Sequence, residues 1–415
     1  MLLRARVLLP VSQPPIADGA IAIAGNRVRQ IGSWRELSRH HSGPVVDLGD
    51  TLLLPGLVNA HCHLDYTSTA GQIAPARRFT DWLKLMTATK TGLTFSDFAE
   101  SWLKGAKMLL RTGVTTVCDV EMSPELLPDV WSATPLRVIS CLEMTGIKSG
   151  RPPAEILRDA MDVLDSLPAG RSRGGLSPHA PYSTAPELLR LAAQTARRRR
   201  LRVVTHVAES DQEFDMFTHG RGEMFDWLKR SRRDMSDCGL GTPVQHMERQ
   251  DALGENLLAI HVNYLGAGDA ALLGRRHVHV VHCPRSHAYF KHAPFPLAEL
   301  TAARVNICLG TDSLVSVRTT RKRSAELNLF DEMRELAARQ PSLAPEKILR
   351  MATVNGARAL GMSGQIGELR PDAFADLIAI PFTGKPADAC EHAVQHRGDV
   401  AASMINGAWA IAPPV

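Results

Sequence analysis

The sequence predicts an α/β fold: a (β/α)8 TIM-type barrel with a small β-sandwich domain formed by both ends of the chain. Apolar strand-like runs alternate with amphipathic helical patterns through the middle of the sequence, and polar residues follow the runs at their carboxyl ends. The two ends instead contain short β-type segments separated by turn residues. We therefore expect the sandwich to comprise residues 1–53 and 363–415, and the barrel residues 54–362.

The terminal segments are rich in β-forming residues and tight turns. The expected strands are Val7–Leu9, Ala20–Ala24, Val28–Ile31, Asp376–Ile380, Val400–Ile405 and Ala408–Ile411. Gly25-Asn26 and Asn406-Gly407 each lie between two of these strands, as expected for hairpin turns. Since chain ends often lie near each other, we expect both groups to form one domain.

The middle of the chain contains eight expected barrel strands. They end near His63, Asp119, Glu143, His179, His206, His261, His282 and Asp312. The helices expected between or after them cover Phe98–Leu110, Pro153–Leu167, a segment capped by Thr184 with Glu187, Glu213–Trp227, and Ser342–Leu360 with Gly361 as its C-cap. A strand-helix unit repeated eight times predicts a closed parallel barrel, whose chemistry lies at the carboxyl ends of the strands.

The composition excludes several classes of partner. The chain has 415 residues, 44% of them hydrophobic, and a net charge of only +5. Its basic runs, Arg197–Arg200 and Arg232-Arg233, are typical of solvated helix faces, so we expect no nucleic acid as partner. No apolar run approaches the ~18 residues of a membrane span. The expected partner is a small-molecule substrate, with a homodimer or a higher homo-oligomer left open.

The seven cysteines are odd in number, scattered, and form no C-x-x-C pair. This pattern favours reduced thiols and a cytoplasmic location. Most of the cysteines lie in apolar strand-like runs, where a thiol packs as a small hydrophobic group.

The segment Leu54–Asp65 reads as a buried strand with His61 and His63 at its end. Residues i and i+2 of a strand share a face, so the two imidazoles are expected side by side. Such a pair can bind one metal ion, or it can be a pair of buried, hydrogen-bonded histidines.

Three further strand ends favour the metal. His206, His261 and Asp312 each follow a mostly apolar run, and five such groups at one barrel rim have no simple structural explanation. Zinc prefers nitrogen and oxygen ligands with a position open for water, and His61, His63, His206 and Asp312 would provide them. A bound metal lowers the pKa of its water towards ~7.

The reaction also needs a residue that transfers protons. Glu209 lies three residues after His206 and could move a proton from the water to the leaving group, although it could instead cap the next helix. His261 could be a further ligand or could hydrogen-bond the attacking water, and we favour the second role.

Together these motifs resemble the amidohydrolase superfamily. The segments that carry the resemblance are Pro-Gly-Leu-Val-Asn-Ala-His-Cys-His, Thr-His-Val-Ala-Glu, Ala-Ile-His, His-Cys-Pro-Arg-Ser and Leu-Gly-Thr-Asp-Ser. They are most similar to the branch of aromatic-ring deaminases and chlorohydrolases, which includes triazine hydrolase and methylthioadenosine/adenosylhomocysteine deaminase. The resemblance implies one divalent metal, zinc or iron, at His61, His63, His206 and Asp312. It also implies Glu209 as proton shuttle, His261 beside the water, and Asp312 as both ligand and proton acceptor.

Other branches of the superfamily bridge two metals with a carboxylated lysine at the end of the fourth strand. Lys148 lies in the expected loop after the third strand, so we expect a single metal. The resemblance implies that His179 contacts the substrate, although it could instead be a structural histidine beneath the rim. Phe79 and Trp82 occupy the long loop with which the family covers its substrate, where Trp82 could stack on a flat ring or could merely pack the lid.

Some further positions are weaker candidates or depart from the family pattern. The weaker candidates for substrate contact are Arg78, Glu143 and Arg221. The departures are Ser286-His287 and Val315–Val317, where the family commonly has an asparagine, and we expect these loops to shape the pocket.

The expected function is a hydrolytic deaminase that releases ammonia from an aminated aromatic N-heterocycle. The favoured substrate is an aminopurine nucleoside of the methylthioadenosine, adenosylhomocysteine or aminofutalosine type. One alternative is a triazine chlorohydrolase or alkylamine hydrolase, or a cyclic amide hydrolase. Another is a non-catalytic binding or scaffold protein on the same fold, although such relatives lose metal ligands and this chain keeps them all.

Overall fold

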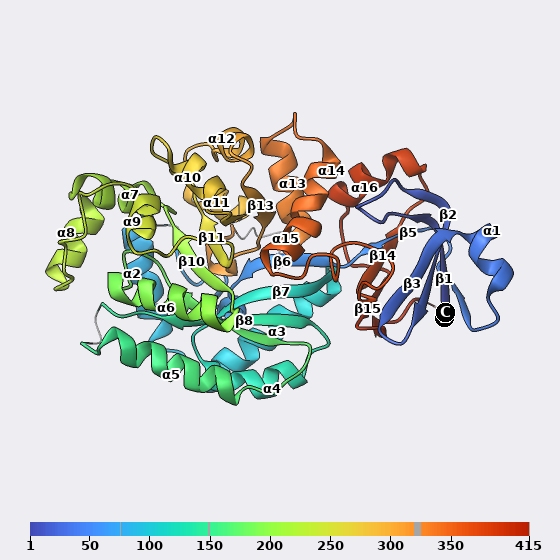
Figure 1. The fold of residues 1–415 in the computed structure, drawn as a ribbon, viewed down its shortest axis with the longest axis horizontal. Helices are drawn as coiled ribbons and strands as arrows, with labels where there is room; N and C mark the ends of the chain where they lie inside the picture. The colour runs from blue at the N-terminus through green and yellow to red at the C-terminus, as the bar shows by residue number, and fades with distance from the viewer. Residues whose placement is uncertain (75, 148–149, 319–324, 415) are drawn as a thin grey trace.

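The computed structural model describes residues 1–74, 76–147, 150–318 and 325–414, and these contain two β-sheets (Figure 1). Eight parallel strands form the larger unit in the order β13-β12-β11-β10-β9-β8-β7-β6. Their bounds are β6 Leu57–Cys62, β7 Val114–Glu121, β8 Arg137–Met144, β9 Arg173–Pro178, β10 Val203–Val207, β11 Leu257–His261, β12 His279–His282 and β13 Asn306–Leu309. A parallel bridge joins Cys62, at the end of β6, to Asp312, three residues beyond β13, and so connects the two edges of the predicted barrel.

The second sheet combines both ends of the chain, as the sequence predicts. Its strand order is β16-β15-β14-β5-β1-β2-β3, with β4 paired to β1. The bounds are β1 Leu2–Leu8, β2 Ile16–Ala24, β3 Arg27–Ser33, β4 Val45–Asp47, β5 Thr51–Pro55, β14 Leu377–Pro381, β15 Ala402–Ile405 and β16 Ala408–Ile411. Figure 1 shows this sheet at one end of the molecule, beside the barrel.

The predicted single strand over Leu54–Asp65 is in fact shared between the two sheets. β5 pairs with β1 and β14 in the terminal sheet, whereas β6 begins the barrel. Gly56 lies between them, and a Cβ there would be 2.1 Å from the Thr115 hydroxyl oxygen, so only glycine fits this crossing. The exact limits of the two domains remain a prediction.

Helices surround the barrel (Figure 1). Those of the first half are α2 Phe79–Lys90, α3 Phe95–Arg111, α4 Leu127–Ser132, α5 Pro153–Ser166 and α6 Pro186–Arg199, and α1 Trp34–Leu37 belongs to the terminal sheet. The later ones are α7 Asp211–His219, α8 Glu223–Arg230, α9 Pro243–Arg249, α10 Asp269–Arg275, α11 Pro284–Phe290, α12 Leu297–Ala302, α13 Leu329–Arg339, α14 Pro345–Met351, α15 Val354–Ala359 and α16 Ala389–Gln395. None of the described helices is long and apolar enough to cross a membrane.

Three helix predictions were wrong in detail. The Thr184 capping box does not form, because α6 begins at Pro186 and the Thr184 hydroxyl donates to the Met144 carbonyl at 3.5 Å. The predicted helix over residues 213–227 is two helices, α7 and α8, separated where Gly220 and Gly222 adopt positive φ. The predicted helix over residues 342–360 is also two, α14 and α15, since Thr353 has a non-helical ψ of −99°.

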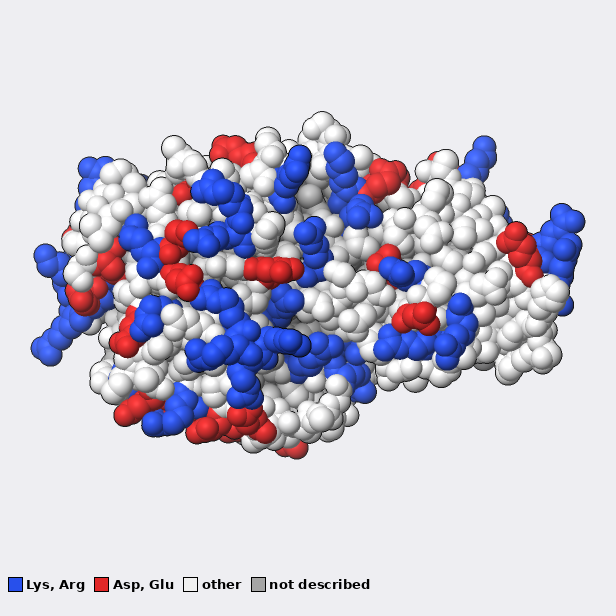
Figure 2. All heavy atoms as spheres, in the orientation of Figure 1, with Lys and Arg blue, Asp and Glu red and all other residues white. Residues whose placement is uncertain are grey.

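The two basic runs differ in their exposure to solvent. Residues 197–200 at the end of α6 are exposed, as predicted, and Figure 2 shows basic side chains gathered over the region of α6 and β8. The prediction was wrong for Arg233, which is buried. Its guanidinium donates to the Asp237 carboxylate and to the carbonyls of Pro181 and Tyr182, and so fixes the loop that follows β9.

Candidate active site

The predicted site residues meet in one cavity of about 340 Å³ at the carboxyl ends of the barrel strands. Those lining it are His63, Phe79, Trp82, His179, His206, Glu209, His261 and Asp312. His61 is fully buried next to them. The barrel therefore brings together side chains that are separated by up to 251 positions in the sequence, from His61 to Asp312.

The histidine ring nitrogens face one another across a small space. Donor atoms of His61, His63 and His206 all lie within 4.8 Å of one another, as do those of His61, His261 and Asp312. The Nε2 atoms of His63 and His206 are 3.4 Å apart, and Asp312 Oδ1 lies 3.6 Å from His61 Nε2 and 3.8 Å from His63 Nε2. This nitrogen and oxygen set could hold a divalent cation such as zinc.

The hydrogen bonding of these rings also fits a metal. His206 Nδ1 donates to the His179 carbonyl at 2.9 Å, which leaves Nε2 unprotonated and free to bind. Both ring nitrogens of His61 are buried with no hydrogen-bond partner in the described structure, and a bound ion would satisfy one of them. Burial, and then the neighbouring imidazole of His61, lowers the pKa of His63 to about 3, so the ring stays in the neutral form that ligates metals.

Asp312 is held by contacts that the sequence did not predict. Its φ is +53°, a left-handed conformation that is rare outside glycine and is often found at functional sites. The Ser316 hydroxyl lies 3.0 Å from Asp312 Oδ2 and 3.0 Å from the Ser313 carbonyl, so it shares its proton between these acceptors, and Oδ1 of Asp312 is directed at the histidines. Ser316 lies in one of the departures from the family pattern, and no local signal in the sequence indicates that it would orient the carboxylate.

The family motifs at both ends of the barrel sheet also contact each other. Asn59 Nδ2 donates to the Thr311 hydroxyl at 2.8 Å, and the Thr311 backbone N–H donates back to Asn59 Oδ1 at 3.0 Å. The Asp312 N–H donates to the His61 carbonyl at 3.2 Å. These bonds close the barrel at the same place where they position two of the candidate ligands.

Glu209 and His261 form a second, adjacent pair. His261 Nε2 lies 3.4 Å from Glu209 Oε1, and both side chains are almost fully buried. Burial, with Asp312 and Glu213 as nearby negative charges, raises the pKa of Glu209 well above its usual value. The backbone at Glu209 is fixed because its N–H donates to Glu213 and its carbonyl accepts from Asn263, each at 2.9 Å. The carboxylate therefore does not cap the next helix; Ser210 does so.

His179 follows β9 and presents one ring nitrogen to the cavity. The Ser183 hydroxyl donates to the Ala180 carbonyl at 3.2 Å, so it accepts the hydrogen bond of 2.6 Å from His179 Nδ1. This assignment leaves Nε2 of His179 as a hydrogen-bond acceptor.

The predicted covering loop contains a helix, α2, that carries both aromatic candidates. The rings of Phe79 and Trp82 stack with centroids 5.8 Å apart, and Phe290 of α11 packs edge-on against both. Trp82 Nε1 is buried without a partner among the described residues. The helix thus gives the cavity an aromatic wall with a free N–H donor.

The weaker candidates divide. Glu143 lines the cavity, whereas Arg78 pairs with Glu223 at 2.7 Å and Arg221 lies 3.5 Å from Asp215, so neither arginine reaches it. Lys148 lies outside the described residues. The departures His287 and Val315–Val317 do not line this cavity, contrary to expectation. Instead, His287 Nε2 bonds the Ala293 carbonyl at 2.8 Å.

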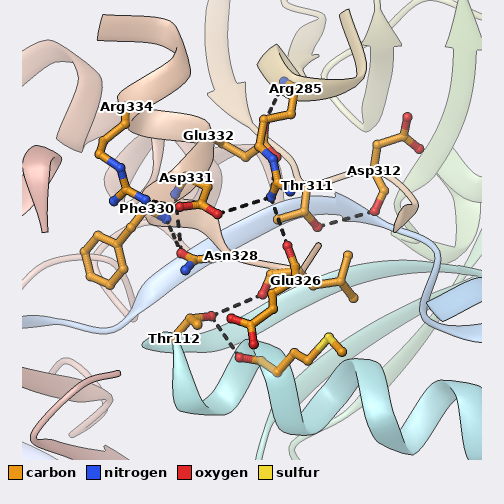
Figure 3. Close-up of polar contacts among 12 residues, drawn as sticks. Thr112, Arg285, Thr311, Asp312, Glu326, Asn328, Phe330, Asp331, Glu332 and Arg334 are labelled. Atoms are coloured by element: carbon orange, nitrogen blue, oxygen red, sulfur yellow. Dashed lines mark hydrogen bonds and ion pairs between the residues drawn. The ribbon is translucent and has the colours of Figure 1, made fainter. Parts of the chain in front are cut away.

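The motif arginine, Arg285, has a structural place behind Asp312 (Figure 3). Its backbone N–H donates to the Glu332 carboxylate at 2.9 Å, and its guanidinium donates to the Glu326 carbonyl at 2.9 Å. Asp331 lies 3.7 Å from the same guanidinium. These bonds connect α11 with α13 and the segment before it, so this part of the barrel wall is held by a polar network.

The fold and the site define a class of protein: a (β/α)8 barrel with a histidine-rich site at its rim that could hold a metal ion. Comparison with known sequences agrees, since the amidohydrolase family model matches residues 52–410. The chain belongs to the amidohydrolase family, whose members are metal-dependent hydrolases, and the resemblance inferred from its motifs is confirmed. The 5-methylthioadenosine/S-adenosylhomocysteine deaminase of Syntrophobacter fumaroxidans is 31% identical over 381 residues, which cover 88% of this chain and 80% of the relative.

Solved structures share the fold. The aminofutalosine deaminase of Helicobacter pylori, in complex with methylthio-coformycin, superposes with a TM-score of 0.87 at 19% identity, covering 98% of this chain and 99% of that one. An adenosine deaminase of Xanthomonas campestris with bound zinc has a TM-score of 0.84 at 22% identity, covering 98% and 92%. The predicted barrel with a smaller terminal sheet is therefore confirmed.

Proposed function

We propose that this protein is a metal-dependent aminohydrolase that deaminates an aminopurine nucleoside and releases ammonia. One observation carries the proposal: the donor atoms of His61, His63 and His206 converge, with Asp312 Oδ1 3.6 Å from His61 Nε2 and 3.8 Å from His63 Nε2, beside the Glu209–His261 pair. The name of the similar deaminase supports the substrate class, since methylthioadenosine and adenosylhomocysteine are adenosine derivatives.

The proposed metal ligands are His61, His63, His206 and Asp312. When bound, a divalent ion acts as a Lewis acid that makes water a better nucleophile at neutral pH. We propose one ion, and zinc as that ion, with iron as the alternative. The unpartnered nitrogens of His61 and the outward-bonded Nδ1 of His206 support this ligand set.

The chain's own residues move the protons. Glu209 takes a proton from the attacking water and delivers it to the amino group that leaves as ammonia. Asp312 accepts the second water proton through Oδ1 while its Oδ2 stays bonded to Ser316, and it then passes this proton to a ring nitrogen of the product, so that the carboxylate is ionised again. His261, 3.4 Å from Glu209, hydrogen-bonds the water and orients it toward the ring carbon. The bond from that carbon to oxygen forms, and its bond to nitrogen breaks.

The aromatic wall and His179 would bind the ring. Trp82 and Phe79 provide flat faces for stacking, and the free Trp82 N–H can donate to a ring nitrogen or another acceptor. His179 Nε2 can accept a hydrogen bond from the exocyclic amino group of the base. A cavity of about 340 Å³ lies within the usual range for small-molecule sites. A cytoplasmic location and a homo-oligomeric state remain predictions.

Glu209→Gln tests the proposal. In protein loaded with zinc or iron, wild type should release ammonia from aminopurine nucleosides, and the variant should bind as much metal but turn over ~10²-fold or more slowly. Glu125→Gln, at an exposed position that does not line the cavity, serves as control and should match wild type. Near-normal turnover in Glu209→Gln would remove Glu209 from the mechanism. Ammonia release from triazines or free pterins, but from no nucleoside, would overturn the substrate class.

A further inference from the structure

The outer part of the cavity contains a charge pair that the proposed mechanism does not use. Glu143 lies near the carboxyl end of β8, and Lys90 is the last residue of α2; both line the cavity. Lys90 Nζ lies 3.9 Å from Glu143 Oε1, and only 8% of the Glu143 side chain is exposed. The two charged groups are therefore close, but the distance between them is longer than a hydrogen bond.

Glu143 is a largely covered acceptor that faces the cavity, and it has no hydrogen-bond donor among the described residues. Burial alone would raise the pKa of its carboxyl, but the positive charge of Lys90 lowers that pKa below its usual value. A carboxylate that faces a cavity either keeps its hydration or accepts hydrogen bonds from a bound ligand. Glu143 is therefore placed to accept from a ligand that enters the cavity.

The Lys90 ammonium contacts an aromatic ring and a thioether sulfur. Its ammonium lies 4.5 Å from the centroid of the Tyr66 ring and 3.6 Å from the Met122 sulfur. The Tyr66 hydroxyl also donates to the Met122 sulfur, at 3.4 Å. These contacts orient Lys90 but leave its N–H donors without an oxygen partner in the described structure.

We infer that Glu143 and Lys90 form a subsite that binds the vicinal hydroxyls of the substrate's ribose, an inference that rests on the proposed function. A carboxylate has two acceptor oxygens, which suits the two O–H donors of a cis-diol. A hydroxyl oxygen about 2.8 Å from each group fits between an ammonium and a carboxylate 3.9 Å apart. One hydroxyl thus donates to Glu143 while accepting from Lys90.

The position of the pair on the barrel rim agrees with this role. Glu143 and Met144 on β8 pair in register with Ser177 and Pro178 on β9, directly before His179. The sugar would therefore lie over β8 when the ring lies against His179 and the aromatic wall. The pair recognises substrate and does not touch the reacting atoms, so it determines specificity.

The test compares adenosine, 2′-deoxyadenosine and 3′-deoxyadenosine on zinc-loaded wild type, Glu143→Gln and Lys90→Met. Wild type should prefer adenosine by ~10- to 100-fold in kcat/KM, the range for hydrogen bonds to charged groups. Each variant should lose most of that preference, mainly through KM for adenosine, with the deoxynucleosides changed much less. Lys84→Met, on the exposed face of the same helix, should keep the preference of wild type.

The outcomes separate the two proposals. Absence of ammonia release from every nucleoside in wild type would overturn the proposed function itself. Deamination without preference for adenosine, or with a preference that both variants retain, would overturn only the ribose subsite. Lys90→Met leaves β8 unchanged, so it decides the question if Glu143→Gln fails to fold.

Discussion

Asp312 occupies a left-handed backbone conformation, and its two carboxylate oxygens have different surroundings. Oδ2 accepts from Ser316 at 3.0 Å, whereas Oδ1 lies 3.6 Å from His61 Nε2. His261 has a similar backbone, with a φ of +72°. Such conformations cost about 1–3 kcal/mol each and persist only where surrounding contacts impose them. The hydrogen bonds of the barrel closure provide those contacts.

Substitutions of Asp312 and Ser316 should therefore reduce the activity to different degrees. Asp312→Asn should abolish turnover with the fold intact, because the proposed metal loses an anionic ligand and the water loses a proton acceptor. Ser316→Ala should keep the metal and lower kcat/KM only ~10-fold, since it removes a single hydrogen bond to a charged group. Metal content, circular dichroism and turnover on the same preparations check both. An active Asp312→Asn enzyme, or a Ser316→Ala enzyme as inactive as Asp312→Asn, would contradict these roles.

Helices α7 and α9 connect the site to the surface through one buried histidine. His246 of α9 is fully buried, its ring centroid is 4.7 Å from that of Phe217 on α7, and Asp237 lies 3.9 Å away. The same helix α7 carries Glu213, which fixes the backbone at Glu209. Burial lowers the pKa of His246 to about 4, although Asp237 opposes the shift.

This burial predicts a pH dependence of stability. A folded-state pKa of about 4, below the unfolded value of about 6.5, means that the stability contributed by neutral His246 is present above pH 6.5 and is lost as the pH falls toward 4. In His246→Gln this contribution does not titrate. The difference in unfolding free energy between wild type and variant should shrink by about 1–2 kcal/mol from pH 7.5 to 5, measured by urea denaturation. His40→Gln, at an exposed position, should keep the pH dependence of wild type. A constant difference for His246→Gln would show that the imidazole is not buried as described.

In the whole molecule, a buried ion pair joins the barrel to the terminal sheet. Arg137 begins β8, and its guanidinium donates to both carboxylate oxygens of Asp376, the residue before β14. Both side chains are at least 97% buried. A second pair between the same two units, Arg111 with Asp399, is about half exposed.

The two pairs should contribute very differently to stability. Arg137→Met leaves the Asp376 carboxylate buried without its cation and should lower the free energy of unfolding by about 3–5 kcal/mol. Arg111→Met, the control, removes two partly exposed pairs, with Asp399 and with Glu326, and should cost only about 0–2 kcal/mol because water screens both. Urea unfolding of both variants at one pH checks the prediction. Equal losses would mean that the contact between barrel and sheet does not depend on the buried pair.

The sequence alone predicted the barrel, its eight strand ends and the cavity-lining set from His63 to Asp312. These features depend on local periodicity and on the rule that polar groups after buried strands meet at one rim, so short segments contain the information. It failed where helices break, as at Thr353 and Gly220, because a local break interrupts little of the apolar pattern.

Only the tertiary structure determined which neighbouring residues position the side chains of the site. The bond from Ser316 to Asp312, the support of Glu209 by Glu213, and the gap between Lys90 and Glu143 all join side chains whose relative positions depend on barrel closure and helix packing. No sequence period encodes such distances, since they arise when distant elements pack against each other. The sequence therefore determined which chemistry the rim could perform, whereas packing decided how each group is oriented and what the cavity can recognise.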